Sequence, residues 1–326
     1  MVKYICKKSS LLELLDWGDL MRWTKMFGIL ATMIVLISTI AGCVIRPVDN
    51  GNGNMTVKDD FGRKVNITGT PSKIISLAPS VTEILYFLGL GDKVVAVDNN
   101  TNYPPEAAKK PMVSGYKYLG TEVIMGLKPD IIFAADINKN DIPTLEQYNL
   151  KVFVLAPKNI SGIFEDLRLV GKIMGIQTTA NAKASSLEER VKAVTDKTLA
   201  QGTSKPRVYL ELDAFMGFYT YGPNSFGDEL IIKSGGENIA HGASSQYPSL
   251  SDEFIVASDP QTIIYQTGPW TTTTPDGIKT RNGWGSITAV KNNALNGVDG
   301  DLVSRPGPRI VDALEAIAKD VHPELF

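Results

Sequence analysis

The feature that most constrains the fold is a sequence segment that occurs twice. Residues 116–129 read Tyr-Lys-Tyr-Leu-Gly-Thr-Glu-Val-Ile-Met-Gly-Leu-Lys-Pro, and residues 247–260 read Tyr-Pro-Ser-Leu-Ser-Asp-Glu-Phe-Ile-Val-Ala-Ser-Asp-Pro. Tyr, Leu, Glu, Ile and Pro recur at five matching offsets. Each copy runs into an apolar, β-branched stretch, 130–134 and 261–265, which is typical of a buried strand. A short helix followed by a strand is therefore predicted twice.

This duplication predicts two similar lobes, on which Glu122 and Glu253 occupy equivalent positions. Two lobes with a cleft between them form a clamp for a ligand. Helix-proline-strand units also recur by chance in α/β proteins, which is the alternative explanation of the match. Five coincident positions in so short a window favour a true internal repeat.

The amino end carries the pattern of an export signal. Residues 27–42 are mostly apolar, follow the basic Arg22 and Lys25, and end in Ala-Gly directly before Cys43. A basic start, a short apolar stretch and a small-residue cleavage site are typical of a secretory signal. About sixteen residues are short for a membrane-spanning helix, which needs roughly twenty. An uncleaved membrane anchor is the alternative, and both interpretations place the following domain outside the cytoplasm.

The position of Cys43 resembles a lipobox, in which cleavage leaves this cysteine as the lipid-bearing first residue of the mature protein. Residues 1–20 do not fit an export signal, whereas a start at Met21 would begin one well. We therefore expect a signal region over 1–43, with translation starting at Met21. The Asn-, Gly- and Pro-rich stretch that follows predicts a flexible tether over 44–55.

Cysteine content and charge exclude several classes of protein. Cys6 lies before the expected cleavage point and Cys43 is the expected lipid carrier, so the mature domain would have no free thiol or disulfide. The net charge of the chain is −2, without a Lys/Arg cluster, which argues against a nucleic-acid partner. About 270 mature residues suffice for one large core or two linked cores.

Alternating strand and helix signals predict α/β lobes. Strands are expected over 73–77 and 93–97, with a helix between them that begins at a capping box, Ser80 to Glu83, and ends before Gly89. A strand over 207–212, a helix over 226–234 and a final helix over 309–320 are expected in the second lobe.

Two helical segments separate the copies of the repeat. Apolar residues recur at helical spacing over 161–174, and residues 179–200 contain no Gly or Pro and keep their apolar side chains on one side. The second segment predicts one long backbone helix that joins the lobes. The expected organisation is an amino-terminal lobe over 56–160, linking helices over 161–203 and a carboxyl-terminal lobe over 204–326.

Five motifs, in order along the chain, carry a family resemblance. They are residues 74–83 (Ile-Ile-Ser-Leu-Ala-Pro-Ser-Val-Thr-Glu), 103–105 (Tyr-Pro-Pro), 127–130 (Leu-Lys-Pro-Asp), 235–239 (Gly-Gly-Glu-Asn-Ile) and 305–309 (Arg-Pro-Gly-Pro-Arg). Together they resemble the substrate-binding proteins of ABC importers that have a helical backbone between two lobes. The resemblance covers about residues 61–326. It implies two Rossmann-like lobes joined by a single long helix, a ligand cleft between the lobes, and a monomer without a cofactor of its own.

Within that family the sequence is most similar to the cobalamin-binding branch. Glu122 and Glu253 match the acidic pair that meets arginines on the two halves of the permease dimer, which works with ATPase subunits. A two-fold channel needs two equivalent contacts, and Arg–carboxylate pairs orient them. The alternative is that these carboxylates only stabilise the positive ends of their own helices, by about 0.3 to 1 kcal/mol each. The two roles are compatible.

The resemblance also implies ligand-binding residues. Tyr103, Tyr116 and Tyr247 match aromatic positions around a corrin ring, and Asp301 and Arg305 match polar contacts on the second lobe. Rigid aromatic faces suit a wide, flat macrocycle. The sequence departs from the branch in four places: tyrosines replace tryptophans at positions 116 and 247, and residues 212 and 135 are Leu and Ala where aromatic residues are expected. These changes leave fewer and smaller aromatic side chains around the expected site of the corrin ring.

Ferric siderophores and haem are the alternative ligands, and an anionic catecholate would need a cation cluster, for which Lys117, Arg281 and Arg305 are candidates. A bare metal ion is a poor fit, because the chain has only two histidines, His241 and His322.

An enzyme is the remote alternative, because no second catalytic signature accompanies the carboxylates Asp213, Asp228 and Glu229, the only hydrolase candidates we find. The sequence thus predicts an extracytoplasmic, lipid-anchored receptor that delivers a corrinoid, or another metal chelate, to an ABC permease.

Overall fold

The computed structural model describes residues 54–115, 118–200, 202–215 and 217–326. The expected signal region, Cys43 and almost all of the tether lie outside these residues. In the first lobe, six strands form one sheet in the order β6-β5-β4-β3-β7-β8. These strands are β3 (Ile74–Ser76), β4 (Val94–Asp98), β5 (Met112–Gly115), β6 (Tyr118–Leu119), β7 (Ile131–Ala134) and β8 (Val152–Val154). All neighbouring pairs are parallel except β5–β6.

Helices cover both faces of this sheet. On β7, Phe133 packs in one hydrophobic cluster with α2 (Pro79–Phe87) and α5 (Ile160–Ile173). Its neighbour Ile132 packs in a second cluster, with α3 (Thr121–Leu127) and α4 (Ile142–Gln147). Alternate strand residues therefore point to opposite layers, as the pleat requires. The apolar run of β7 is that of a strand buried on both faces.

The second lobe repeats this arrangement around a mixed sheet of order β12-β10-β9-β13-β14, with β11 paired to the start of β9. These strands are β9 (Arg207–Asp213), β10 (Phe218–Thr220), β11 (Glu237–Asn238), β12 (Ser249–Leu250), β13 (Thr262–Thr267) and β14 (Leu295–Asp299). Strands β9, β13 and β14 are parallel to one another. The helices of this lobe are α7 (Phe226–Lys233), α8 (Asp252–Ser258), α9 (Pro275–Lys279), α10 (Thr288–Lys291), α11 (Gly300–Ser304) and α12 (Ile310–Val321).

Two further kinds of element complete the described chain. Strands β1 (Asn54–Lys58) and β2 (Lys64–Thr68) pair as an antiparallel hairpin that precedes β3 in the chain. Single 3-10 turns occupy Gly91–Lys93, Ala107–Lys109, Asp136–Asn138, Trp284–Ser286 and Pro323–Leu325. The hairpin was not among the elements expected from the sequence.

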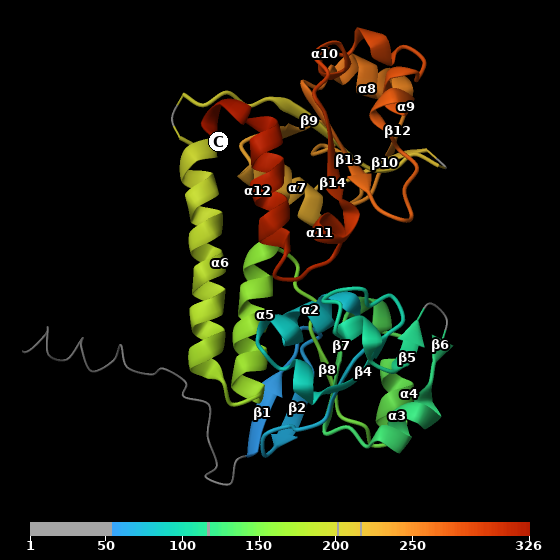
Figure 1. The fold of residues 1–326 in the computed structure, drawn as a ribbon, viewed down its shortest axis with the longest axis vertical. Coiled ribbons are helices and arrows are strands. Elements are labelled where there is room, and N and C mark those ends of the chain that lie inside the picture. Colours follow the sequence, from blue (N-terminus) through green and yellow to red (C-terminus); the bar gives the residue numbers. More distant parts are fainter. Residues whose placement is uncertain (1–53, 116–117, 201, 216) are drawn as a thin grey trace, which may run out of the picture. The chain divides into compact units, whose positions relative to one another are not determined.

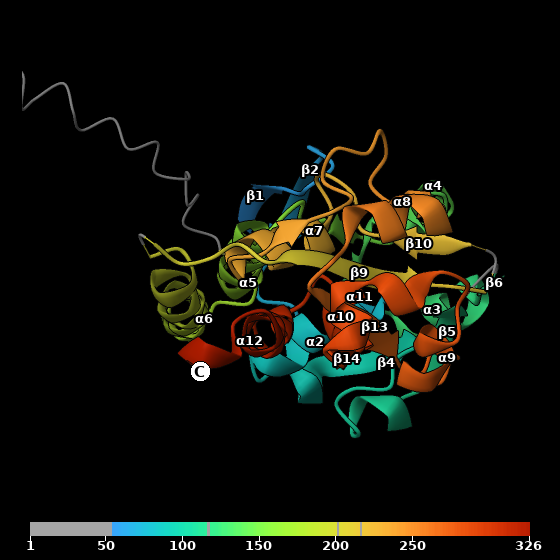
Figure 2. The ribbon, with the colours of Figure 1, turned by 90° about the horizontal axis from the view of Figure 1, so that it is seen from above.

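The lobes are joined by a helical spine. Helix α6 (Gln177–Thr198) follows α5, and Figure 1 shows it running alongside both lobes. Figure 2 shows α12 beside it, so α6 packs on α5 from one lobe and α12 from the other. At the α5–α6 contact, a Cβ on Gly171 would lie 2.1 Å from Cβ of Ala180, so only glycine allows this close approach. One hydrophobic cluster runs from β3 and α2 through α5 and α6 to α12, and this shared core ties the lobes together.

The internal repeat is present in the structure. Helices α3 and α8 both have seven residues, both follow a two-residue edge strand, and both lead into a buried strand. Both also end on a residue in the left-handed region, Lys128 with φ 49° and Asp259 with φ 43°. The expected two α/β lobes and the long helix between them are therefore found.

The expected capping box is wrong. Helix α2 begins with Ala78 as its N-cap, which has no side-chain capping bond, and Pro79 at its first position. Glu83 does not turn back to the helix start, because its carboxylate pairs with Arg309 on the other lobe. The expected end of this helix is correct: the chain turns at Gly89, which has φ 81°. In the part of the chain that the structure describes, no helix is long and apolar enough to cross a membrane.

The matched ends of α3 and α8 generate a stability prediction. Lys128 holds a left-handed conformation that costs a non-glycine residue about 1 to 2 kcal/mol, and no hydrogen bond of its side chain compensates among the described contacts. We expect Lys128→Gly to raise the free energy of unfolding, net of the added chain entropy, by roughly 0.5 to 1 kcal/mol in urea denaturation.

Asp259→Gly is the matched comparison. The Asp259 carboxylate accepts bonds from the Thr288 backbone N–H at 2.7 Å and from its hydroxyl at 3.0 Å. We expect this second variant to lose stability. Equal changes in the free energy of unfolding for the two variants would contradict the assignment of uncompensated backbone strain to Lys128.

Candidate functional site

The carboxyl ends of the strands of both sheets meet at an interlobe cleft. Residues that follow β3, β7 and β8 in the first lobe line one cavity of about 260 Å³ together with residues from the second lobe. Its lining comprises Ala78, Pro79, Ser80, Ala135, Asp136, Ile137, Ala156, Pro157, Phe226, Tyr247, Ser304, Arg305 and Pro306. Ligands of open α/β sheets bind at this edge, outside the carboxyl ends of the strands. The expected cleft between the lobes is therefore present.

Two further cavities adjoin the interlobe cavity. One, of about 680 Å³, lies on the first lobe and shares Ile137 with it; Asp98, at the end of β4, also lines this space. Burial raises the pKa of Asp98, although the Asn100 backbone N–H donates to its carboxylate at 2.8 Å. The other, of about 200 Å³, lies on the second lobe, shares Ser304, and includes Trp270 and Asp301. Together the three cavities form a broad binding surface rather than one deep pocket.

The predicted tyrosines have different outcomes. Tyr247 lines the interlobe cavity, half exposed, with its ring edge against Tyr221 at a centroid distance of 5.9 Å. Its partial burial raises the pKa of its hydroxyl. Tyr103 lines none of the three cavities; the Arg309 guanidinium lies 4.0 Å from its ring centroid. Tyr116 lies outside the described residues, so its role stays a prediction.

Asp301 and Arg305 face the cleft but are already engaged with the first lobe. Asn102 donates to Asp301 at 2.8 Å and accepts from Arg305 at 2.6 Å. Arg305 also pairs with Asp301 at 2.9 Å. Both side chains line cavities, so a ligand would meet them as members of a lobe-to-lobe network. Their assignment as ligand contacts stays a prediction.

Beneath this network lies a buried ion pair between the lobes. Glu83 of α2 is 3% exposed and accepts two bonds from Arg309, at 2.9 Å from Nε and 2.6 Å from the terminal nitrogen. Arg305 approaches the same carboxylate at 3.4 Å. The bidentate geometry orients both lobes, because a planar guanidinium meets a carboxylate in one plane. The interlobe network is defined here as Glu83, Asn102, Asp301, Arg305 and Arg309.

The expected cation cluster for an anionic ligand is wrong for Arg281. Its guanidinium pairs with Glu211, which is 1% exposed, and lies against the rings of Phe218 and Trp284 at 4.9 and 4.5 Å. Arg281 is therefore held in a pair within the second lobe and lines none of the cleft cavities. Lys117 lies outside the described residues. Of the two candidates that the structure describes, only Arg305 lines a cleft cavity.

Trp284 is likewise not a cleft residue. It is fully buried, and its indole N–H donates to Asp252 at 2.5 Å. Trp270 is the opposite case, since it is 89% exposed and lines the cavity of the second lobe. Of these two tryptophans, Trp270 is therefore the one that a bound ligand can touch.

The sequence reasoning missed the cleft residue Ile137 and a second exposed apolar residue, Phe215, which lines none of the cleft cavities. Ile137 follows β7 and is 70% exposed, and Phe215 follows β9 and is 83% exposed. With Trp270, which follows β13, they are the three most exposed large apolar side chains among the described residues. All three lie two or three residues after the carboxyl end of a strand, but only Ile137 and Trp270 line cleft cavities. An isolated apolar residue in a loop has no periodic sequence signal, although its place after a predicted strand was readable.

Glu122 and Glu253 are both exposed, in the first turns of α3 and α8. A hydrogen bond from its own backbone N–H, with a second from Ser251, lowers the pKa of Glu253. Val123 and Phe254 beside them are also about half exposed. The two glutamates thus occupy equivalent, accessible positions, as the repeat predicts. Their docking role stays a prediction.

The carboxylates considered for hydrolysis are each engaged by other groups. Asp228 is buried, accepts from Asn238 at 2.8 Å and lies 3.0 Å from His241 Nδ1. Glu229 accepts from the Ile160 backbone N–H at 2.8 Å, and Asp213 from that of Phe215 at 3.0 Å. Each has a structural partner of its own. Across the described residues, no three His, Cys, Asp or Glu side chains gather as a metal cluster.

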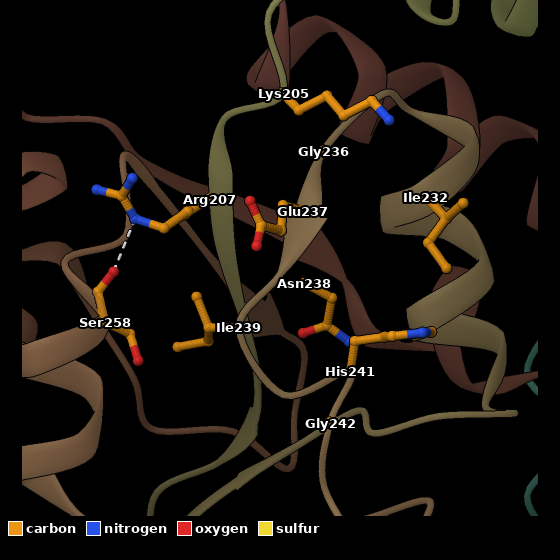
Figure 3. A pocket seen from close by; sticks show the side chains of 10 residues that line it. All are labelled: Lys205, Arg207, Ile232, Gly236, Glu237, Asn238, Ile239, His241, Gly242 and Ser258. Atoms are coloured by element: carbon orange, nitrogen blue, oxygen red, sulfur yellow. Dashed lines mark hydrogen bonds between the residues drawn. The ribbon is translucent and has the colours of Figure 1, made fainter.

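A separate cavity of about 600 Å³ lies at the amino ends of β9 and β11, shown in Figure 3. Arg207 and Glu237, the first residues of these strands, line it, and Arg207 donates to the Ser258 carbonyl. It shares no lining residue with the cleft cavities. His241 belongs to this space and not to the cleft.

With this geometry in place, comparison with known proteins identifies the family. A family model described as periplasmic binding protein matches residues 74–302, most of the described chain. The chain belongs to the periplasmic binding protein family. This periplasmic binding protein is 30% identical over 323 residues to an uncharacterized ABC transporter substrate-binding lipoprotein, YvrC, of Bacillus subtilis, an alignment that covers 93% of this chain and 99% of the relative.

Two further matches of this periplasmic binding protein name ligands. A vitamin B12-binding protein of Vibrio vulnificus is 30% identical over 262 residues, covering 78% of this chain and 92% of the relative. The crystal structure of a possible iron-binding protein of Staphylococcus epidermidis is 29% identical, with a TM-score of 0.69, covering 78% of this chain and 99% of that chain. The periplasmic binding protein described here is therefore an extracytoplasmic substrate-binding protein of an ABC transporter, and its relatives are transport proteins rather than enzymes. That role implies a permease, an ATPase and a small-molecule ligand as partners.

The interlobe network yields a second stability prediction. Glu83→Gln would leave Arg309 buried without its counter-charge, so we expect the free energy of unfolding to fall by about 3 kcal/mol or more in urea denaturation. The matched control is Glu188→Gln, which breaks the surface pair of Glu188 with Arg168. That change should cost less than about 1 kcal/mol. Similar losses in the two variants would show that the pair between the lobes is not a main stabilising contact.

Proposed function

We propose that this periplasmic binding protein carries a corrinoid of the cobalamin class and delivers it to an ABC permease. The single observation that carries the proposal is the exposed apolar edge of the cleft, formed by Ile137, Tyr247 and Trp270, which line the cleft cavities. Exposed apolar side chains gathered at one site mark a binding surface. A wide, flat macrocycle is the kind of ligand that such a surface can cover.

The charge of the cleft supports a ligand that is not an anion. Across the described residues that line the three cleft cavities, Arg305 is the only cation. Five aspartates line the same cavities: Asp98, Asp136, Asp141, Asp299 and Asp301. A catecholate siderophore or the propionates of haem would lie among these carboxylates with little compensation. The amide-rimmed periphery of a corrinoid instead offers N–H donors, which carboxylates accept well.

A ferric siderophore without net negative charge is the second candidate. The Staphylococcus epidermidis relative, named as possibly iron-binding, supports this class. The vitamin B12-binding relative of Vibrio vulnificus supports the first. The proposal for a corrinoid therefore rests on the apolar cleft edge and the acidic lining, with the relatives as secondary support.

Delivery is proposed to use the paired glutamates. Glu122 and Glu253 stand exposed at the starts of equivalent helices, and a two-fold permease needs two equivalent contacts. The lipid-bearing Cys43 would hold the protein at the extracytoplasmic face of the membrane, beside the permease. We expect a monomer to serve each permease dimer.

The ligand class can be tested by titration. Cyanocobalamin, a ferric hydroxamate, a ferric catecholate and haem are added separately while tryptophan emission is followed. We expect a saturable change with cyanocobalamin, because Trp270 lies in the cleft, and no such change with the catecholate. Trp270→Phe should remove most of the signal and weaken binding by about 1 to 2 kcal/mol, measured by calorimetry.

Trp284→Phe is the control, because this indole is buried away from the cleft and should leave the ligand-induced change intact. A response to ferric chelates alone would overturn the corrinoid assignment.

The docking role can be tested by charge reversal. Glu122→Arg with Glu253→Arg should leave calorimetric ligand affinity unchanged, since neither side chain lines a cleft cavity. Uptake by cells that depend on this protein should fall by about tenfold or more, because two charge pairs with the permease would be lost. Glu189→Gln with Glu237→Gln changes exposed carboxylates elsewhere and serves as the control. Normal uptake by the double reversal would refute docking through these glutamates.

A further inference from the structure

We infer that the Ser304 hydroxyl is a fixed hydrogen-bond donor in the cleft and selects a ligand that presents an uncharged oxygen acceptor, such as an amide carbonyl. The inference rests on the proposed function in one respect, because it requires that the cleft binds a ligand. It does not require that the ligand is a corrinoid.

Ser304 stands at the border between two cleft cavities. It is the last residue of α11 and is exposed. Among the described residues, it alone lines both the interlobe cavity and the cavity of the second lobe. A ligand that extends from one of these cavities into the other therefore passes this side chain.

Two buried side chains of the second lobe contact the Ser304 hydroxyl. Tyr221 directly follows β10 and is 2% exposed, and Gln266 lies on β13 and is 6% exposed. Ser304 Oγ lies 2.9 Å from the Tyr221 hydroxyl oxygen and 3.1 Å from Gln266 Nε2. Gln266 Nε2 also donates to the Tyr221 hydroxyl oxygen. We call Gln266, Tyr221 and Ser304 the hydroxyl relay.

The directions of these bonds follow from the hydrogens that each group carries. An amide nitrogen only donates, so Gln266 gives one N–H to Tyr221 and the other to Ser304. Burial raises the pKa of the Tyr221 hydroxyl, which therefore keeps its single proton at neutral pH. Among the described contacts, Ser304 Oγ is the acceptor that remains for this proton. Tyr221 therefore donates to Ser304, because the opposite direction would leave a buried phenol proton without an acceptor.

These directions leave the hydroxyl hydrogen of Ser304 available to a ligand. A serine oxygen has two lone pairs and one hydrogen, and the bonds from Gln266 and Tyr221 occupy both lone pairs. In the part of the chain that the structure describes, the Ser304 hydroxyl makes no other hydrogen bond. Its hydrogen lies away from the two buried partners, on the side where Ser304 lines the cavities. The hydroxyl can thus donate to a ligand but not accept from one.

The position of Tyr221 fixes this direction in the unliganded protein. A Cβ on Gly227 would lie 2.2 Å from the Tyr221 ring, so helix α7 packs directly on the ring. The Asn238 side chain donates to the Tyr221 backbone carbonyl at 2.7 Å. Both the ring and the backbone of Tyr221 are therefore held. A donor that is already oriented costs less conformational entropy when the ligand binds.

The other polar groups of the cleft decide which acceptor fits Ser304. Asp299 and Asp301 line the same cavity of the second lobe, and ionised carboxylates accept hydrogen bonds but do not donate them. A negatively charged oxygen of a ligand would be repelled by these two side chains. An uncharged amide fits, because its carbonyl oxygen accepts from Ser304 while its N–H groups donate to the carboxylates.

The test measures the calorimetric affinity of the full protein for cyanocobalamin. Ser304→Ala removes the donor, and we expect Kd to rise by about three- to tenfold, the usual effect of one uncharged hydrogen bond. Ser304→Thr keeps a hydroxyl and should restore most of the affinity. The control is Ser286→Ala, at an exposed serine of the same lobe outside the cleft cavities, which should leave Kd unchanged.

A second pair of variants tests the hydroxyl relay itself. Gln266→Met removes the donor to the Tyr221 oxygen, so Ser304 can turn its hydrogen inward and donate to Tyr221. We expect affinity to fall although Ser304 is unchanged, and Ser304→Ala should then cause no further loss in the Gln266→Met background. Additive losses would overturn the relay, because Gln266 would then act on the ligand independently. Thermal unfolding of each variant shows that a lost affinity is not a lost fold.

The outcomes separate this inference from the proposed function. If the unchanged protein binds a ferric hydroxamate, a ferric catecholate or haem but not cyanocobalamin, the corrinoid assignment is wrong, and the same variants are measured with the ligand that binds. Equal affinity of Ser304→Ala and the unchanged protein for that ligand overturns the inference and leaves the proposed function standing. Saturable binding of none of the four ligands overturns both.

Discussion

The ion pair between Glu83 and Arg309 is the interaction on which the arrangement of the two lobes depends. Glu83 comes from the first helix of one lobe and Arg309 from the start of the last helix of the other. A buried carboxylate that lost this partner would remain unsolvated, so opening the lobes at this point is expensive. Gly307 supports the contact, because a Cβ there would lie 3.3 Å from a Glu83 oxygen. The hydrophobic cluster that runs through α5, α6 and α12 acts in the same direction. Ligand entry is therefore expected to use small lobe movements and loop rearrangement rather than wide hinge opening.

Much of the fold was predictable, because most of its elements carry strong periodic signals. The strand after each copy of the repeat, the helix over Ile160–Ile173 and the long helix over Gln177–Thr198 were all expected close to their observed bounds. The capping box at Ser80 failed for a physical reason. Glu83 has the right spacing for a local cap, but its partner Arg309 lies 226 positions away, and only the folded chain brings them together. The β1–β2 hairpin was missed although Lys64–Thr68 alternates polar and apolar side chains, which is a readable strand signal.

The candidate site was predictable to a smaller extent, because exposure and pairing are properties of the folded molecule. Tyr247 and Arg305 were expected in the cleft and line it. Arg281 was expected to be an accessible cation, yet Glu211 and two aromatic rings enclose it. The sequence contains nothing that distinguishes an arginine paired in this way from an accessible one. Ile137 and Phe215 were missed for the converse reason, since single apolar residues in loops are common and usually without consequence. Ile137 gains its meaning only from the folded chain, where it lines two of the cleft cavities.

The two helices that present Glu122 and Glu253 match in length and in their left-handed ends but differ at their beginnings. The Ser251 hydroxyl accepts from the Phe254 N–H at 3.2 Å, and the neighbouring Asp252 is tied to Trp284, so α8 starts from a fixed point. Helix α3 starts after Gly120, which has no side chain with which to cap it. Fraying of the first turn therefore costs less in α3 than in α8. A partner of perfect two-fold symmetry would thus meet a well-anchored first turn in α8 and a more easily frayed first turn in α3. The two ends of this pseudo-symmetric molecule are therefore not equivalent.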